Sequence, residues 1–228
     1  MGLALGGTPN HRVWALTEQG PNWARLDQLA PGSYVAIRRG DEVWGESDLS
    51  PDLAYVLGVI SGDGSQSSEY VLQIANSDLD LLRRCQETLA RAGGGEGHIS
   101  KSRNTYNLRF NTKSFRQRLL ALGVSVCRSE GKTVPHAVLS ASCACVVNYL
   151  AGLFDTDGCI THRRPTQLAF EITLKSPELI RQVQLLLLNL GIVGRRAPKT
   201  IKYRYKERAE ERTYWRLTVY GSDLERLM

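Results

Sequence analysis

Two patterns of apolar residues run along this chain, and each pattern recurs. Near residues 53–64 and 147–158 the apolar positions form runs of helical length, which predict two buried helices. Elsewhere apolar and polar residues alternate, as expected for strands with one buried and one exposed face. The apolar side of these strands comprises Tyr106, Leu108, Phe110, Leu168, Phe170, Ile172, Leu174, Ile201, Tyr203 and Tyr205. Sheets with one face against helices predict an α+β fold.

The chain contains an internal repeat. The segment LAYVLGVISGDGS, from Leu53, matches VNYLAGLFDTDGC, from Val147, and further on LLRRCQETLARAG matches LIRQVQLLLLNLG. Each copy reads as helix, two strands, helix, two strands and a short helix, and Asp78 and Ser176 are the predicted N-caps of the second helices. The predicted domains are a β-rich segment at 1–48, the first repeat at 49–122, a linker at 123–142 and the second repeat at 143–228.

Each of the two repeated helices carries small residues four positions apart. The stripes are Ala54, Gly58 and Gly62 in one helix, and Asn148, Gly152 and Thr156 in the other. Such stripes let two helix backbones approach closely, so we expect the copies to pack about a pseudo-twofold axis. Asp63 and Asp157, at the helix ends, then become neighbours. Paired carboxylates repel, and a divalent cation, best Mg²⁺, relieves that repulsion. The alternative is that each aspartate only precedes a glycine that ends a helix.

The charge of the chain favours a polyanionic partner. Lys and Arg number 29 against 23 Asp and Glu, which gives a net charge of +6 and a pI near 9.2. Basic residues recur on the polar strand positions of both repeats, and this recurrence favours a binding face over an ordinary solvated surface. The odd number of cysteines, five, and the lack of a signal peptide or a membrane-length apolar run predict a cytoplasmic protein.

The doubled motif identifies a family. The segment LAGLFDTDG, Leu150 to Gly158, closely resembles the motif of the LAGLIDADG homing endonucleases, and Val56 to Gly64 is a looser copy with Ser61 at the position of an acid. The resemblance implies a two-repeat monomer of pseudo-twofold symmetry whose sheets form a DNA-binding saddle. It also implies Mg²⁺-dependent cleavage of both strands of a long double-stranded DNA site, with Ca²⁺ or Mn²⁺ as substitutes. The implied metal ligands are Asp63, Asp157 and the carbonyls of Gly62 and Thr156.

Family members also keep a basic residue at the edge of each active site. Lys175 takes this place in the second repeat, whereas the first repeat offers Ser77, so we expect unequal cutting of the two strands. Equal cutting would instead indicate that another cation, with Lys101 as the first candidate, replaces the missing lysine. An ordinary phosphate contact is the alternative role of Lys175. The expected DNA-contacting residues are Lys101, Arg103, Asn107, Arg109, Lys202, Arg204, Lys206 and Arg216. The alternative function is DNA or RNA binding without cleavage, as in a maturase or a transcription factor.

The first fifty residues fit neither repeat. Thr8 to His11, TPNH, followed by LAPGSYVA from Leu29, resembles a conserved block of intein splicing (Hint) domains, in which Thr and His activate the first scissile amide. A buried strand histidine is the commoner role for such a residue. The chain begins Met1-Gly2 and lacks a terminal His-Asn pair, so we expect Thr8 and His11 to belong to a remnant of that domain without splicing activity.

Overall fold

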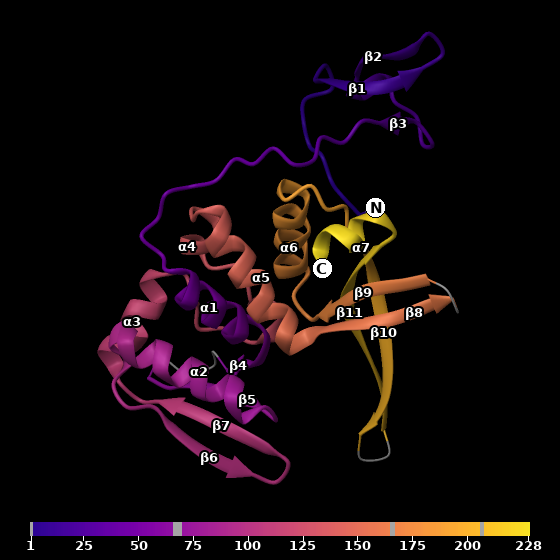
Figure 1. Ribbon diagram of the computed structural model, residues 1–228. Helices are drawn as coiled ribbons and strands as arrows, with labels where there is room; N and C mark the ends of the chain where they lie inside the picture. Colours follow the sequence, from indigo (N-terminus) through magenta and orange to yellow (C-terminus); the bar gives the residue numbers. More distant parts are fainter. Residues whose placement is uncertain (1, 66–69, 165–166, 206–207) are drawn as a thin grey trace.

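The computed structural model describes residues 2–65, 70–164, 167–205 and 208–228, without the side chains of 163–164, 203–205 and 208–210. Two α/β units of the same architecture lie side by side, and a small sheet projects from them (Figure 1). Among the described residues, no helix is both long and apolar enough to cross a membrane.

The two units have the same order of elements, which confirms the predicted α+β fold. The first unit comprises α1 (Pro51–Asp63), β4 (Gly64–Ser65), β5 (Leu72–Asn76), α2 (Leu79–Leu89), β6 (His98–Ser102), β7 (Thr105–Phe110) and α3 (Lys113–Ala121). The second comprises α5 (Cys143–Asp157), β8 (Gly158–Arg164), β9 (Gln167–Leu174), α6 (Pro177–Asn189), β10 (Arg195–Tyr205), β11 (Arg208–Tyr220) and α7 (Ser222–Leu227). The sheet orders, β4-β5-β7-β6 and β8-β9-β11-β10, correspond strand for strand.

Local capping explains where the helices begin. The Ser50 side chain accepts a hydrogen bond from the backbone of Leu53, and Pro51 follows at the first helical position of α1. Asp78 caps α2 and Ser176 caps α6 in the same way, as predicted from the sequence. Asp78 and Ser176 thus mark the points at which the chain passes from β5 and β9 into the following helices.

The helices α1 and α5 pack against each other at very short range. An added Cβ would lie 2.1 Å from the Tyr149 carbonyl oxygen at Gly58, and 2.0 Å from the Tyr55 carbonyl oxygen at Gly152. Only glycine fits at either position, because no real Cβ approaches a carbonyl so closely. The predicted contact between the two stripes of small residues is therefore confirmed at its centre.

Two tyrosines reinforce this pseudo-twofold contact in equivalent ways. Tyr55 of α1 donates a hydrogen bond to Asp155 of α5 (2.7 Å), and Tyr149 of α5 donates one to Ser61 of α1 (3.0 Å). Position 61 lies inside the helix pair, because Ser61 is buried and also donates to the Leu57 carbonyl. Ser61, which departs from the acid of the family motif, thus has a structural role.

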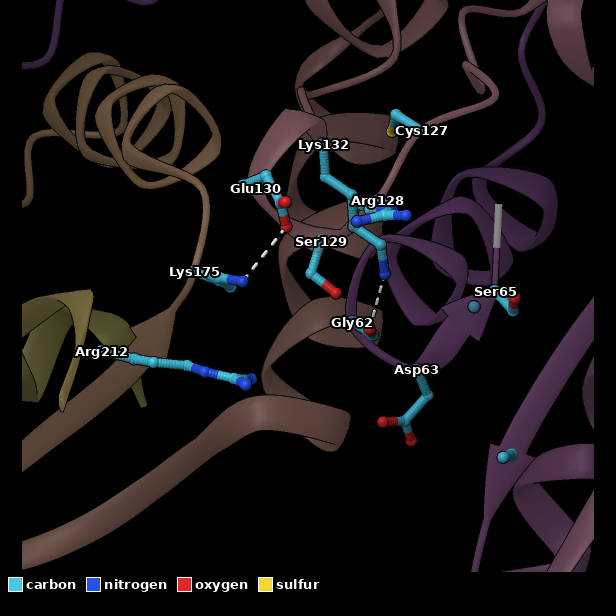
Figure 2. Close-up of a pocket in the computed structure, with 12 residues that line it drawn as sticks. Gly62, Asp63, Ser65, Cys127, Arg128, Ser129, Glu130, Lys132, Lys175 and Arg212 are labelled. Carbon is cyan, nitrogen blue, oxygen red and sulfur yellow. Dashed lines mark hydrogen bonds and ion pairs between the residues drawn. The ribbon is translucent and has the colours of Figure 1, made fainter. Parts of the chain in front are cut away.

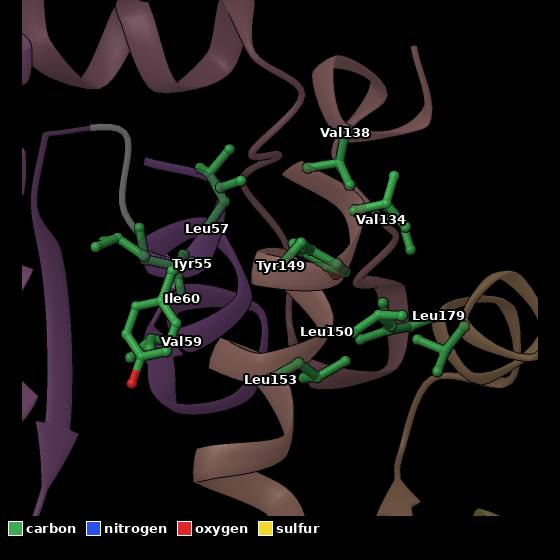
Figure 3. Close-up of a cluster of buried hydrophobic side chains, with 14 of the residues drawn as sticks. Tyr55, Leu57, Val59, Ile60, Val134, Val138, Tyr149, Leu150, Leu153 and Leu179 are labelled. Atoms are coloured by element: carbon green, nitrogen blue, oxygen red, sulfur yellow. The ribbon is translucent and has the colours of Figure 1, made fainter. Parts of the chain in front are cut away.

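The core is continuous across the two units. Buried side chains of α1 and α5 meet residues of the connecting segment and of α6, among them Leu57, Tyr149, Val138 and Leu179 (Figure 3). The predicted buried strand face is confirmed for Phe170, Ile172 and Leu174 on β9. It is wrong for Leu168, which is 42% exposed because β9 extends beyond the helices that cover the rest of the sheet.

Two segments lie outside the repeated units. At the N-terminus, β1 (Arg12–Thr17), β2 (Gly20–Arg25) and β3 (Tyr34–Val35) form a three-stranded sheet, followed by a strand-free segment that reaches α1. That segment attaches to the second unit, since the Gly40 amide donates to the Leu188 carbonyl (2.9 Å) and Arg39 pairs with Asp223 (2.8 Å). The connecting segment between the units contains η3 (Ser129–Gly131) and α4 (His136–Leu139).

Candidate active site

Asp63 and Asp157 are the last residues of α1 and α5, and the close helix contact brings these two ends together. A Cβ added to Gly62 would lie 2.0 Å from the Thr156 hydroxyl and 2.8 Å from the Asp157 carboxylate. The two repeats therefore meet at the residues for which the sequence predicts metal binding. Both aspartates are partly buried.

The surroundings of the two carboxylates oppose their ionisation. Burial, followed by the charge of Asp63, raises the pKa of Asp157 to about 6. Burial also raises the pKa of Asp63, while the Asn76 amide, which donates to its carboxylate at 2.6 Å, acts in the opposite direction. A site that holds two such groups close together is suited to a cation.

Lys132, in the connecting segment, supplies one positive charge at this point. Its ammonium group is buried, with the residue 7% exposed, and donates to the carbonyls of Ser61 (2.9 Å), Gly62 (2.8 Å) and Ile60 (3.4 Å). Burial lowers the pKa of Lys132, and the charges of Asp157 and Asp63 counteract that effect. A lysine at a helix C-terminus also offsets the negative end of the helix dipole.

Sequence reasoning did not identify Lys132. It lies in the segment interpreted as a linker, about seventy residues from the carbonyls that it contacts, and no periodicity marks it. The available signal is weak: a single lysine between Gly131 and Thr133.

An open cavity of about 850 Å³ adjoins Asp63 (Figure 2). Its lining includes four cationic side chains from three parts of the chain, namely Arg128, Lys132, Lys175 and Arg212. A smaller cavity of about 150 Å³ adjoins Asp157 and shares Lys132 and Lys175 with the first. The two aspartates thus open onto a strongly positive recess, which suits phosphate groups.

The predicted basic residue Lys175 lies at this recess, in the turn between β9 and α6. Its ammonium group pairs with Glu130 of η3 at 3.3 Å. Ser77, its counterpart in the first repeat, is exposed and does not line either cavity. Lys101, the candidate replacement for the missing cation, lies outside both cavities, on β6 against the Tyr106 ring. The cations beside Asp63 that come from the connecting segment are Arg128 and Lys132.

The predicted DNA-contacting residues lie on two sheets. Asn107 and Arg109 of β7 are bonded to Gln73 of β5, which holds them on one sheet face. On the second sheet Lys202 pairs with Glu211 at 2.8 Å and Arg216 with Glu171 at 3.6 Å. Arg103 is in the turn of the β6–β7 hairpin with a positive φ of 52°. The Arg204 backbone belongs to β10, but its side chain and all of Lys206 lie outside the described residues.

The predicted splicing-block residues form a turn ahead of β1. The His11 amide donates to the Thr8 carbonyl at 2.9 Å, and the Thr8 hydroxyl donates to Asn10. Both Thr8 and His11 are exposed, far in sequence and position from the paired aspartates. The predicted commoner role, a buried strand histidine, is therefore wrong for His11.

The donor set fits a magnesium-like ion with few protein ligands. Within the described part of the chain, no group of three or more His, Cys, Asp or Glu side chains is arranged to hold a metal. Mg²⁺ is commonly bound through one or two carboxylates, water and substrate phosphates, so two mutually repelling aspartates suffice. The Gly62 carbonyl, a predicted ligand, already accepts a hydrogen bond from Lys132, whereas Thr156 shows its hydroxyl bonded to the Leu153 carbonyl.

Comparison with known families agrees with this architecture. The family model described as a LAGLIDADG-like domain matches residues 144–228, and the model described as a WhiA LAGLIDADG-like domain matches residues 53–122. The chain therefore carries two LAGLIDADG-like domains.

Solved structures of the homing endonuclease I-DmoI have the same fold. One of them, from a study of mesophilic variants of I-DmoI, superposes with a TM-score of 0.52 at 17% identity, covering 78% of this chain and 92% of that chain. A second, a variant bound to its target DNA in the presence of manganese, gives a TM-score of 0.51 at 17% identity over 77% of this chain and 90% of that chain. At this identity the likeness establishes the two-repeat fold alone.

Curated relatives match the chain within much longer proteins. The replicative DNA helicase DnaB of Rhodothermus marinus is 31% identical over 209 residues, which are 86% of this chain and 22% of that protein. RecA of Mycobacterium tuberculosis is 28% identical over 208 residues, 84% of this chain and 25% of that protein. A ribonucleoside-diphosphate reductase subunit of Bacillus subtilis is 26% identical over 209 residues, 84% of this chain and 19% of that protein. The chain thus spans a quarter or less of these relatives.

Proposed function

We propose that this protein is a site-specific DNA endonuclease that cuts both strands of a long duplex site with the help of a divalent metal ion. The convergence of Asp63 and Asp157 beside a positive cavity carries this proposal. Burying two carboxylates together costs stability, and a function that needs a cation between them accounts for that cost.

Two aspartates and two lysines have separate roles in the proposed reaction. Asp63 and Asp157 would hold Mg²⁺, which supplies an activated water and stabilises charge on the phosphate and the leaving oxygen. Burial raises the pKa of both carboxylates, and the charge of Lys132 partly offsets that rise. Lys175 stands at the mouth of both cavities, where it can stabilise negative charge on a scissile phosphate.

The two sheets would hold the DNA. They carry Arg109, Lys202 and Arg216 on polar strand positions, and such side chains contact phosphates and base edges in the major groove. The structural neighbours from I-DmoI include complexes with target DNA in the presence of manganese and magnesium, which supports DNA as partner and Mg²⁺ as cofactor. A monomer suffices, because the two repeats already provide both halves of the site.

Binding without cleavage is the second candidate function. The WhiA-type match of residues 53–122 favours it for the first repeat, and so does Ser61, which replaces an acid of the motif. Retention of Asp63, its hydrogen bond from Asn76 and the adjoining Lys132 favour the endonuclease instead. A protein that only binds DNA has no need of an ionised pair at this point.

We further infer an origin within an intein. The relatives named above carry unrelated names, and this chain matches a quarter or less of each, as expected for an inserted element. A match over 86% of a 228-residue chain cannot be confined to residues 51–228, so it includes part of the N-terminal β-rich segment. This supports a splicing-domain origin for that segment. A cytoplasmic location at the nucleoid follows from DNA as the substrate.

Cleavage selection tests the proposed function. A library of randomised duplexes is incubated with the protein and Mg²⁺, and the new ends are sequenced. The proposal predicts one enriched long site with short 3′ overhangs at a fixed position. Enrichment of a bound sequence without new ends would favour the binding-only function.

A further inference from the structure

The connecting segment around η3 is fixed to both repeats at the edge of the cavity. Lys132 binds the carbonyls at the end of α1, and its own carbonyl accepts a hydrogen bond from Ser176 at 2.6 Å. The Val134 amide donates to the Gln182 side chain at 2.7 Å. These contacts hold the backbone that directly follows Glu130, and they do not use its carboxylate.

Glu130 extends from this fixed segment into the positive recess. Figure 2 shows its carboxylate directed at the ammonium group of Lys175, and the two atoms are 3.3 Å apart. Of the residues that line the larger cavity, Glu130 and Asp63 are the acids, against four cations. A hydrogen bond from its own backbone amide, together with Lys175, lowers the pKa of Glu130, so the carboxylate is ionised at neutral pH.

The ion pair contributes little to folding. The Glu130 side chain is 52% exposed and the Lys175 side chain is 31% exposed, and pairs of such exposure stabilise proteins weakly. Its larger effect is on an incoming phosphate, because the Glu130 carboxylate neutralises the charge of Lys175 and competes with the phosphate for its ammonium group. The displaced carboxylate then remains close to the DNA and repels it.

We propose that Glu130 is a specificity-determining residue that holds Lys175 as an ion pair until a correctly placed DNA phosphate displaces it. The inference rests on the proposed function, because it assigns a control to the same site. A DNA sequence that fits the two sheets brings a phosphate close enough to take over Lys175. A sequence that fits poorly leaves the ion pair of Glu130 and Lys175 intact and makes one phosphate contact fewer.

The restraint of Lys175 by Glu130 can be measured without cleavage, from the affinity of the protein for unrelated DNA. The probe is a fluorescein-labelled duplex lacking the selected site, titrated in Ca²⁺ buffer at several salt concentrations. The variants are Glu130→Gln, Lys175→Met and the double variant. Glu225→Gln is the matched control, because Glu225 is an exposed acid on α7, outside both cavities, and its loss changes the net charge equally.

Release of Lys175 from its ion pair with Glu130 should change both the affinity for DNA and its salt dependence. Glu130→Gln should tighten binding of the unrelated duplex by roughly three- to tenfold and steepen the slope of log K against log salt by about 0.9, the value for one added phosphate contact. The gain should disappear in the Lys175→Met background, and Glu225→Gln should change affinity less than twofold. Cleavage of near-matched sites should rise together with binding.

Other outcomes overturn the inference. An unchanged or weaker affinity of Glu130→Gln would show that the carboxylate does not restrain Lys175. An equal gain in the Lys175→Met background would reduce the effect to net charge. Failure of the unaltered protein to bind any duplex, whatever the salt concentration, would refute the proposed function itself. Thermal melting of each variant identifies any loss of folding.

Discussion

Asp157→Asn should make the metal-free protein more stable, although it removes a residue of the proposed active site. Asparagine keeps the shape of aspartate and removes its charge, so both the burial cost and the repulsion from Asp63 are lost. The pKa of Asp157 rises from 3.8 to about 6 in the folded state. A rise of about two pKa units corresponds to a loss of roughly 3 kcal/mol in the free energy of unfolding when the carboxylate is ionised.

The pH dependence fixes the sign of this effect. Because the pKa of Asp157 is raised on folding, its contribution to stability is fully present below the unfolded pKa and is lost as the pH rises through about 6. The free energy of unfolding of the variant should therefore exceed that of the unaltered protein by about 3 kcal/mol at pH 8 and by less than ~1 kcal/mol at pH 4. Urea denaturation in EDTA at both pH values measures the difference.

A matched control separates this effect from a general loss of negative charge. Asp48→Asn alters an exposed aspartate outside the site, and its free energy of unfolding should change by less than ~0.5 kcal/mol. Added Mg²⁺ should stabilise the unaltered protein and have no such effect on Asp157→Asn. A variant that is less stable than the unaltered protein at pH 8 would refute the reasoning, because the carboxylate would then be favourable in its place.

Three further changes test separate parts of the structure. Gly152→Ala places a Cβ 2.0 Å from the Tyr55 carbonyl and should destabilise the protein by more than ~3 kcal/mol in urea denaturation, whereas Ala151→Ser beside it should be tolerated. Lys132→Met removes the lysine donor from the carbonyls of Ser61 and Gly62 and should lower the free energy of unfolding by about 1–3 kcal/mol at pH 8; unchanged stability would contradict the capping role. Lys175→Met should slow the cutting of one DNA strand much more than the other, because Ser77 supplies no charge in the first repeat; strand-specific end labels on a plasmid would show equal slowing if this were wrong.

The repeated elements could be predicted from the sequence because their signals are local. Periodicity and capping residues such as Ser176 indicate where helices and strands lie, and the glycine stripe predicts the helix contact at Gly58 and Gly152. These signals arise from residues that are close in the sequence, so they can be recognised before the fold is known. The same reasoning failed at Leu168, since periodicity does not show how far a strand extends beyond its covering helices.

The electrostatics of the site could be predicted only in part. Asp63 and Asp157 were found because the repeat marks both, whereas Lys132 reaches them through long-range contacts that leave no pattern in the sequence. The ion pair of Lys175 with Glu130 is of the same kind. A side chain that enters a site from a connecting segment becomes visible only when the backbone is placed in three dimensions.

Strand-resolved cleavage of the selected site tests the central claim most directly. The unaltered protein, Asp63→Asn and Asp157→Asn are compared on the same end-labelled duplex in Mg²⁺, and binding is measured in parallel in EDTA. The account predicts metal-dependent cutting of both strands by the unaltered protein, and specific binding with cleavage slowed at least a hundredfold in each variant, on the order of 3 kcal/mol in the barrier. Cleavage by either variant at the rate of the unaltered protein would contradict the assignment of Asp63 and Asp157 as the centre of the reaction.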